Sequence, residues 1–473
     1  MRYTHDVIVI GAGAGGLTAA GGCALFGLKV ALIERAEMGG ECLNNGCVPS
    51  KALITAAKRA AEAREEKRYG VQLAAPRVEW AGVRAHIHQA IADIAPHDSQ
   101  ERFEEMGCDV YRGHATFVHK RKVRVGEVEL AAPKIVIATG SEPFIPPIEG
   151  LEHVPYLTNE NIWDLDQLPQ HLVIVGGGVI GMEMAQSFRR LGSEVTVIEP
   201  GEPMGRDDPE SVAVVVETMK AEGVMFVRGK AAKVTPGALA SFTVTLEDGE
   251  EIAGTHLLVA VGRRARTDGY GLGRIGVELG ENGIIVDDRR RTSLKHIYAI
   301  GDCREGPRLT HVSGYEGSNV ALEITLGLPT KVDWSALPWC TYTSPEVAQI
   351  GMTEAQAREQ HGDKVTVVRE GFDHNERAIA EGDTRGHLKV VMQGKKVLGA
   401  SIVSRNAGDM LLPFTQLITG KASTFALGSA IVAYPTRSEI TKAAAFSAWE
   451  GTVFGSVPKG YAKTRAWFRK TLS

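Results

Sequence analysis

Short runs of consecutive hydrophobic residues recur along the chain, and several end directly in glycine. Residues 7–10 (Val-Ile-Val-Ile) lead into Gly11, and residues 172–175 (Leu-Val-Ile-Val) lead into Gly176. A run that is apolar at every position is typical of a strand buried on both faces of a parallel sheet. The pattern therefore predicts an α/β fold with at least two strand–turn–helix units.

The first unit carries a complete nucleotide-binding pattern. Gly11, Gly13 and Gly16 form a G-x-G-x-x-G turn after the first strand, and the next strand, residues 30–33, ends at Glu34. Such glycines allow a tight turn and close backbone approach, while the helix N-terminus offers amides to a pyrophosphate. The acid suits a ribose with free hydroxyls, so this Rossmann-like unit is predicted to bind FAD.

The same pattern occurs a second time, at one constant offset and without a gap. Gly176, Gly178 and Gly181 follow the second apolar run, and Glu199 ends the strand at residues 195–198. Two copies in strand context, each with its acid ~20 residues on, are strong evidence for two dinucleotides. Glu199 would repel a 2′-phosphate, which favours NADH. Arg206, a few residues downstream, keeps NADPH as the second choice.

Residues 39–51, which read GGECLNNGCVPSK, hold two cysteines with four residues between them. A structural disulfide between Cys42 and Cys47 would close too small a loop to stabilise a long chain, so we favour a redox role. Pro49 suits the first turn of a helix, which places Cys47 where amides and the helix dipole favour a thiolate. Lys51, one turn further on, adds positive charge. The segment predicts a redox-active dithiol beside a nucleotide cofactor.

Taken together, these motifs resemble the pyridine nucleotide–disulfide oxidoreductases, in the branch of dihydrolipoamide dehydrogenases and mercuric reductases. The resemblance continues through residues 135–140, 258–263, 297–302 and 342–348. It implies an FAD-binding domain (1–150), an NAD(H)-binding domain (151–270), a return segment of the FAD domain (271–333) and an α+β dimerisation domain (334–473). It also implies a homodimer whose active site is completed by the partner's C-terminal segment.

The resemblance assigns further residues to the two cofactors. Those expected near FAD are Gly40, Lys51, Thr139, Gly140, Asp302 and His311, and Gly262 is expected near NAD. It also pairs Lys51 with Glu183, although an exposed helical glutamate and, for His311, a helix cap stay open as alternatives. Electrons are expected to pass from NADH to FAD and on to the Cys42–Cys47 disulfide. Cys47 then remains as thiolate while Cys42 exchanges with substrate. Cys303 and Cys340 are expected to be packed small residues.

The C-terminal segment departs from the family pattern at one position. Dihydrolipoamide dehydrogenases carry His-Pro-Thr-x-x-Glu, with the histidine as base, whereas this chain has Tyr434 at that position and keeps Glu439. A phenol of pKa ~10 is a poor base at neutral pH. Mercuric reductases resemble the chain in this tyrosine, but they use a vicinal cysteine pair near the C-terminus. No cysteine follows Cys340.

Three functions therefore stay open. The first is a dihydrolipoamide dehydrogenase-like reductase acting on a small or protein-bound disulfide or dithiol. The second is a mercuric-reductase-like enzyme that reduces a metal ion or another electrophile. The third is a flavoprotein whose main role is to bind a membrane or a partner. No resident metal is predicted in any of them.

Composition says more about the cellular location and partners of the protein than about its reaction. The net charge of −4 argues against bulk affinity for nucleic acid. The absence of an apolar run near ~20 residues, of room for a signal peptide, and of a secreted cysteine framework indicates a cytoplasmic protein. After Glu450 the chain has five Lys or Arg residues with Tyr461, Trp467 and Phe468. This basic tail is predicted to contact a membrane or protein partner, or to pack on its own dimer.

Overall fold

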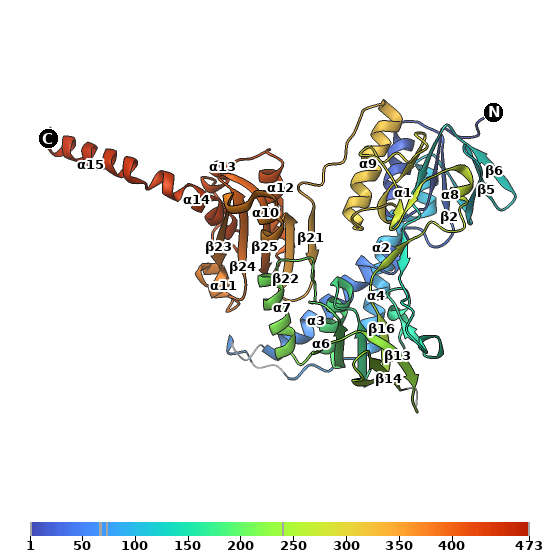
Figure 1. Cartoon of the computed structure of the whole chain (residues 1–473), viewed down its shortest axis with the longest axis horizontal. Helices are drawn as coiled ribbons and strands as arrows, with labels where there is room; N and C mark the ends of the chain where they lie inside the picture. The colour runs from blue at the N-terminus through green and yellow to red at the C-terminus, as the bar shows by residue number, and fades with distance from the viewer. Residues whose placement is uncertain (1, 66–68, 72–73, 239–240, 472–473) are drawn as a thin grey trace. The chain divides into compact units, whose positions relative to one another are not determined.

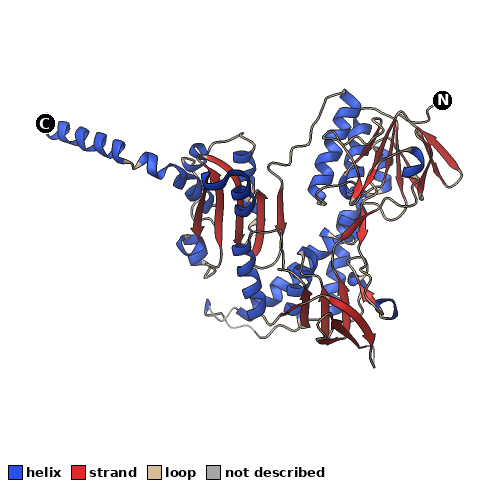
Figure 2. Ribbon diagram, in the orientation of Figure 1, coloured by secondary structure: helices blue, strands red, loops and turns tan. Residues whose placement is uncertain are grey.

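The computed structural model describes residues 2–65, 69–71, 74–238 and 241–471, which form two compact units. Unit 1 comprises Met1–Gly201 and Val224–Val332, and unit 2 comprises Glu202–Gly223 and Asp333–Ser473. Figures 1 and 2 show the elements of each unit. Parallel sheets lie in unit 1 and an antiparallel sheet lies in unit 2. The predicted combination of α/β nucleotide-binding folds with a C-terminal α+β domain is confirmed.

The first parallel sheet of unit 1 has the strand order β20-β7-β1-β2-β3. Its strands are β1 (Val7–Ile10), β2 (Val30–Glu34), β3 (Cys108–Arg112), β7 (Lys134–Ile137) and β20 (Ile297–Ala299). Every residue of β1 and β2 is buried, which explains why these runs are apolar at each position. Helices α1 (Ala14–Leu25) and α9 (Thr310–Leu326) pack against each other beside this sheet.

The second parallel sheet of unit 1 has the strand order β12-β11-β10-β16-β9. Its strands are β9 (Tyr156–Leu157), β10 (His171–Val175), β11 (Glu194–Glu199), β12 (Met225–Arg228) and β16 (His256–Val259). Val7 pairs with Val30 in the first sheet, and Leu172 pairs with Val195 in the second. Both pairs are related by the offset of the sequence repeat, so the repeat is also structural. Helix α6 (Val179–Leu191) follows β10 as α1 follows β1.

Smaller elements complete unit 1. The helices are α2 (Gly40–Asn44), α3 (Cys47–Glu65), α4 (Trp80–Ile94), α5 (Gln100–Glu105) and α8 (Leu272–Ile275). The strands are β4 (Ala115–His119), β5 (Lys122–Val125), β6 (Val128–Ala131), β8 (Ser141–Pro143), β13 (Ala231–Pro236), β14 (Phe242–Leu246), β15 (Glu251–Gly254), β17 (Arg263–Ala265), β18 (Leu279–Gly280) and β19 (Gly283–Ile284). Strand β8, which follows β7 of the first sheet, pairs antiparallel with strand β17, which follows β16 of the second sheet.

Unit 2 is built on the sheet β21-β22-β25-β24-β23, whose neighbouring strands all run antiparallel. Its strands are β21 (Pro338–Thr341), β22 (Glu346–Gly351), β23 (Val365–Gly371), β24 (His387–Gln393) and β25 (Lys396–Ser404). Its helices are α7 (Pro209–Ala221), α10 (Glu354–His361), α11 (Glu376–Ala380), α12 (Leu412–Ile418), α13 (Thr424–Gly428), α14 (Glu439–Val453) and α15 (Ser456–Thr471).

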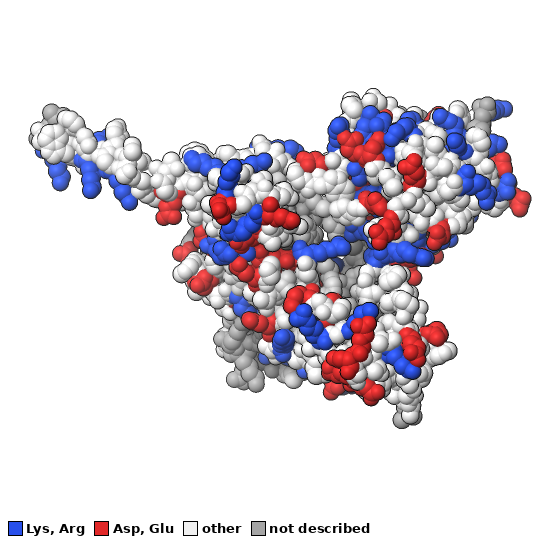
Figure 3. Space-filling view, viewed as in Figure 1, with Lys and Arg blue, Asp and Glu red and all other residues white. Residues whose placement is uncertain are grey.

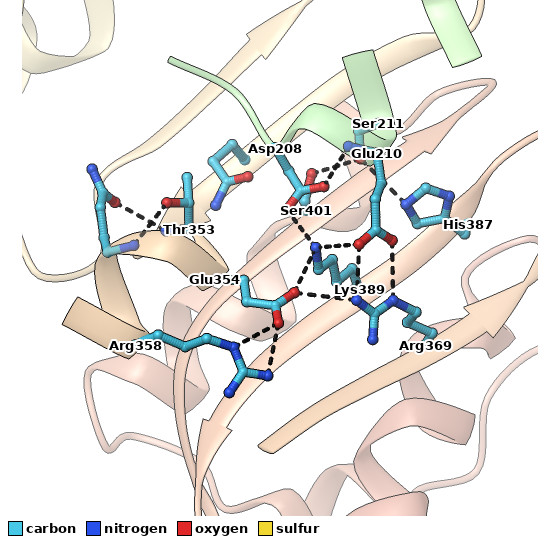
Figure 4. A network of polar contacts seen from close by, with 12 residues as sticks. Asp208, Glu210, Ser211, Thr353, Glu354, Arg358, Arg369, His387, Lys389 and Ser401 are labelled. Atoms are coloured by element: carbon cyan, nitrogen blue, oxygen red, sulfur yellow. Dashed lines mark hydrogen bonds and ion pairs between the residues drawn. The ribbon is translucent and has the colours of Figure 1, made fainter. Parts of the chain in front are cut away.

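The segment Glu202–Gly223 groups with unit 2, although it falls within the 151–270 range expected for the NAD domain. Lys389 of β24 provides the physical reason, because its side chain is only 3% exposed and lies among three carboxylates (Figure 4). Its Nζ is 2.8 Å from Asp208, 2.9 Å from Glu210 and 2.8 Å from Glu354. Asp208 caps the N-terminus of α7, so a buried charge of the sheet holds this helix.

The same cluster brings Asp208, Glu210 and His387 close enough to be considered as metal ligands, with their ligand atoms within 4.8 Å of one another. The Lys389 ammonium already supplies the positive charge that these carboxylates need. The cluster is therefore explained as an ion-pair network within unit 2.

Candidate active site

The two glycine-rich turns have nearly the same local structure. Gly11 has φ +105° and Gly176 has φ +111°, a region that disfavours residues with a side chain. A Cβ at Gly16 would lie 1.8 Å from the Gly11 carbonyl oxygen, and one at Gly181 would lie 1.9 Å from that of Gly176. Both turns are thus tight enough to require glycine. They lead into α1 and α6 through the N-cap residues Gly13 and Gly178.

The predicted ribose-binding acids are held in equivalent ways at the two turns. Glu34 accepts a hydrogen bond from the Ala12 amide at 2.6 Å, and Glu199 accepts one from the Gly177 amide at 2.7 Å. The other oxygen of each carboxylate accepts from the amide two residues further along, at 2.8 and 2.9 Å respectively. Each site combines a glycine turn, a helix N-terminus and an oriented carboxylate, so the residues present fit two dinucleotide cofactors.

The two predicted redox cysteines meet where α2 and α3 adjoin. Cys42 lies in α2, Cys47 is the first residue of α3, and both are free thiols in the structure. The Cys42 thiol donates a hydrogen bond to Cys47, and the Thr310 hydroxyl lies 3.3 Å from the Cys47 sulfur. These two hydrogen bonds and the nearby Lys51 lower the pKa of Cys47 to about 6. The pKa of Cys42 is raised, because its thiol donates a hydrogen bond to Cys47 and because burial disfavours its charged form.

Lys51 and Glu183 form the ion pair that the family resemblance implied. The Lys51 ammonium lies 2.9 Å from Oε2 and 3.2 Å from Oε1 of Glu183. The Glu183 side chain is only 4% exposed, so the alternative of an exposed helical glutamate is wrong. Because Lys51 is on α3 and Glu183 is on α6, the pair links the helix of the dithiol to the helix of the second glycine turn.

A polar chain that the sequence analysis missed begins inside the cysteine segment. Glu41, the residue before the first cysteine, forms an ion pair with Arg263 and accepts a hydrogen bond from Asn159 at 2.8 Å. Arg263 donates to the Ser141 hydroxyl at 2.8 Å, and Ser141 donates to Asp302 at 2.7 Å. Burial raises the pKa of Glu41, and Arg263 opposes that rise. The one available signal was a charged residue between Gly40 and Cys42.

Other predicted cofactor residues lie around these turns. A Cβ at Gly40 would be 2.7 Å from the Gly13 Cα, which brings the cysteine segment against the first turn. Thr139 donates to the Arg266 carbonyl oxygen at 2.7 Å. Positive φ angles of +72° and +132° occur at Gly140 and Gly262.

His311 is exposed in the first turn of α9, next to Thr310. Its neighbour Thr310 lies within hydrogen-bonding distance of the Cys47 sulfur. The expectation that Cys303 is a packed small residue is confirmed, since it is fully buried and burial raises its pKa to about 11. Cys340 is half-buried, and its sulfur would lie 3.2 Å from a Cβ at Gly408.

Tyr434 and Glu439 lie in unit 2, with Tyr434 in the loop before α14 and Glu439 as the first residue of that helix. The Tyr434 side chain is 69% exposed, and the neighbouring carboxylates of Glu376 and Glu439 raise its pKa. Glu439 accepts a hydrogen bond from the Thr436 amide at 3.1 Å. A phenol whose pKa lies above its ordinary value is an even poorer proton acceptor at neutral pH.

Comparison with known proteins agrees with this arrangement. Residues 5–317 match the model of the family described as pyridine nucleotide-disulphide oxidoreductase, and residues 337–445 match its dimerisation domain, which supports a homodimer. The chain is 35% identical to a mercuric reductase of Lysinibacillus sphaericus over 94% of this chain and 82% of the relative. It is 34% identical to a dihydrolipoyl dehydrogenase of Geobacillus stearothermophilus over 93% of this chain and 95% of the relative.

A solved structure gives the same result for the fold. The HOCl-induced flavoprotein disulfide reductase RclA from Escherichia coli aligns with a TM-score of 0.83 and 27% identity, covering 93% of this chain and 99% of that one. Its copper(II) complex aligns equally well. The chain therefore belongs to the pyridine nucleotide–disulphide oxidoreductases, flavin-dependent enzymes that act on sulfur groups with NAD(P)H.

Proposed function

We propose that this protein is an NADH-dependent disulfide reductase in which Cys42 and Cys47 carry electrons to an external disulfide. The observation that carries the proposal is the geometry around Cys47, the first residue of α3. Its sulfur lies beside Cys42, 3.3 Å from the Thr310 hydroxyl and near the Lys51–Glu183 pair, and these groups lower its pKa. A lowered thiol pKa combined with an adjacent protonated thiol is the arrangement that thiol–disulfide exchange requires.

The two glycine turns divide the cofactors between them. FAD would be held by the first turn, Glu34 and Asp302, and it supplies two-electron transfer between a nicotinamide and a disulfide. The second turn and Glu199 would hold NADH. Two backbone amides hold the Glu199 carboxylate at the end of β11, where its charge would repel the 2′-phosphate of NADPH.

The two cysteines have different roles in the proposed exchange. Cys42 attacks one sulfur of the substrate and forms a mixed disulfide, while its proton passes through the Cys47 thiolate to the departing sulfur, which leaves as the first substrate thiol. The Cys47 thiolate then attacks Cys42, restores the intramolecular disulfide and releases the second thiol. Overall, NADH, a proton and one disulfide give NAD⁺ and two thiols. Thr310 and Lys51 keep Cys47 ionised for the second attack.

Tyr434 argues against the lipoyl group as the substrate of this dithiol. Oxidation of a dithiol substrate needs a base that accepts its proton, and such help is typically worth ~10²–10⁴-fold. The raised pKa of the Tyr434 phenol makes it unsuited to that task. In the reverse direction the same group would return that proton to the departing thiolate, so its absence slows lipoamide turnover both ways and favours disulfides whose thiols have a lower pKa and leave without protonation.

A second candidate function is the reduction of a thiol-bound soft metal ion. It is favoured by Tyr434, because the resemblance to mercuric reductases includes a tyrosine at this position. It is also favoured by relatives that are named mercuric reductase. Against it stands the absence of any cysteine after Cys340 that would deliver the metal. The metal ion would be the substrate and not a resident cofactor.

A substrate panel tests both candidates. NADH oxidation by the purified flavoprotein is measured with glutathione disulfide, lipoamide, a quinone and Hg(II) bound by excess thiol. We expect turnover of a disulfide that Cys42→Ser and Cys47→Ser each abolish. Turnover of Hg(II) alone would replace the first candidate by the second. Substantial turnover of lipoamide would refute the second candidate, the reduction of a metal ion. A colourless protein, or a flavoprotein inactive with the whole panel, would refute both.

A further inference from the structure

The C-terminal helix α15 has a separate apolar stripe that the catalytic chemistry does not use. Val457, Tyr461, Thr464 and Phe468 occur at positions i, i+4, i+7 and i+11, so they share one face of the helix. The side chains of Val457, Tyr461 and Phe468 are 81%, 69% and 52% exposed. None of the described residues of α15 is buried. The stripe is therefore uncovered within the described part of this chain.

Basic side chains lie on other faces of the helix than this stripe. Lys459, Lys463 and Lys470 lie on the opposite face, while Arg465 and Arg469 lie on one flank of the stripe. Figure 3 shows basic side chains in a row along the helix. All five are exposed, and no acidic residue follows Glu450. Because the whole chain has a net charge of −4, this helix is a local concentration of positive charge.

The helix also lies outside the match to the family's dimerisation domain. The dimerisation model ends at residue 445, before α15 begins at Ser456. A helix of this length without tertiary packing is marginal in water, so it gains stability when its apolar face is covered. No helix among the described residues is long and apolar enough to cross a bilayer. If a bilayer covers the apolar stripe, α15 must therefore lie along the bilayer surface and not cross it.

We propose that α15 anchors this flavoprotein to the surface of an anionic lipid bilayer. The stripe would lie at the boundary of headgroups and acyl chains, and Trp467 and Tyr461 are residue types that favour this layer. An apolar stripe with cations on the opposite face and on one flank matches a helix lying in the membrane plane, with the stripe toward the acyl chains and the cations toward the headgroups. Clusters of four to eight Lys or Arg on an amphipathic helix are typical of anionic-lipid binding. A homodimer presents two such helices, which increases the avidity.

The test uses the full-length flavoprotein and sucrose-loaded vesicles that are sedimented. Vesicles of phosphatidylcholine alone are compared with vesicles containing about one third phosphatidylglycerol, a composition that supplies the surface charge. We expect the protein to sediment with the anionic vesicles only and to be released by 0.5 M salt, an ionic strength that screens the attraction. Equal binding to both vesicle types, or to neither, would overturn the proposal.

Two variants and one control localise the effect. Lys459→Gln/Lys463→Gln/Lys470→Gln should weaken partitioning about 100-fold, at roughly fivefold per residue. Lys364→Gln/Lys396→Gln/Lys421→Gln removes the same charge from exposed lysines elsewhere in unit 2 and should change partitioning less than about fivefold in total. Equal losses in the two triple variants would refute a site on α15.

The apolar stripe and the oligomeric state are tested separately. Tyr461→Ser/Phe468→Ser keeps every charge and should also reduce vesicle binding, because it removes two of the exposed apolar side chains. A chain ending at Gly455 should stay dimeric by light scattering, keep its flavin and lose vesicle binding. If that chain becomes monomeric, α15 docks on a second copy of the protein and the membrane proposal is wrong. These readouts do not depend on which substrate the enzyme reduces.

Discussion

The hydrogen bond from Thr310 provides the sharpest test of how the dithiol is tuned. Thr310→Val keeps the shape of the side chain and removes the hydroxyl that lies 3.3 Å from the Cys47 sulfur. A hydrogen bond to a charged group is worth ~1.5–3 kcal/mol, and the exposure of Cys47 puts this one at or below the lower end. Since one pKa unit corresponds to ~1.4 kcal/mol, we expect the pKa of Cys47 to rise by about one unit.

The thiolate fraction of Cys47 at neutral pH should fall strongly in this variant, because the pKa of Cys47 starts at about 6. Raising it to about 7 lowers the thiolate fraction at pH 7 from roughly 90% to roughly one half. The assay is the pH dependence of the thiolate-to-flavin charge-transfer absorbance. It is measured in a Cys42→Ser background, where Cys47 is the one remaining thiol of the pair and the serine hydroxyl still donates.

A matched control lies on the helix that Cys47 begins. Thr55→Val makes the same change on α3, where the Thr55 hydroxyl donates to the Lys51 carbonyl oxygen at 2.7 Å. It should leave the midpoint of the titration unchanged. A shift below about 0.3 pH unit in Thr310→Val, or equal shifts in the two variants, would refute the role assigned to Thr310. Replacing Cys42 by Ala instead of Ser should raise the midpoint further, because the Cys42 hydrogen bond has the largest effect on the Cys47 pKa.

Three further predictions address substrate, nucleotide and stability. Tyr434→His should increase dihydrolipoamide oxidation by roughly one to three decades, because it restores a proton acceptor; no gain in a folded, flavin-loaded variant would assign the exclusion of lipoamide to pocket shape. Glu199→Ser should raise the NADPH-to-NADH ratio of kcat/KM about 10- to 100-fold, since it removes a charged acceptor and its repulsion; an unchanged ratio would show that Glu199 does not set the preference. Lys389→Met leaves three carboxylates without their shared cation and should cost about 3–5 kcal/mol of unfolding free energy, measured by urea denaturation. Lys396→Met, at an exposed position of β25, is the control, and equal losses in the two variants would refute the network's role.

The sequence by itself determined the local chemistry of the nucleotide sites. The glycine spacing, the fully apolar strands and the terminal acids act over short stretches of chain, where backbone sterics decide the outcome. The positive φ at Gly11 and Gly176 and the amide contacts of Glu34 and Glu199 follow directly from those residues. The position of Cys47 at a helix start was likewise readable, because Pro49 and the family motif mark that turn.

Tertiary structure decided which distant residues meet. Thr310 reaches Cys47 across 263 positions and Glu183 reaches Lys51 across 132, and the first of these contacts has no local signal. The grouping of Glu202–Gly223 with unit 2 was also hidden, because Lys389 finds Asp208 only once β24 and α7 are packed. Local preferences fix turns and strand faces within a few residues. A buried charge, by contrast, selects its partner from whatever the finished fold brings within hydrogen-bonding distance.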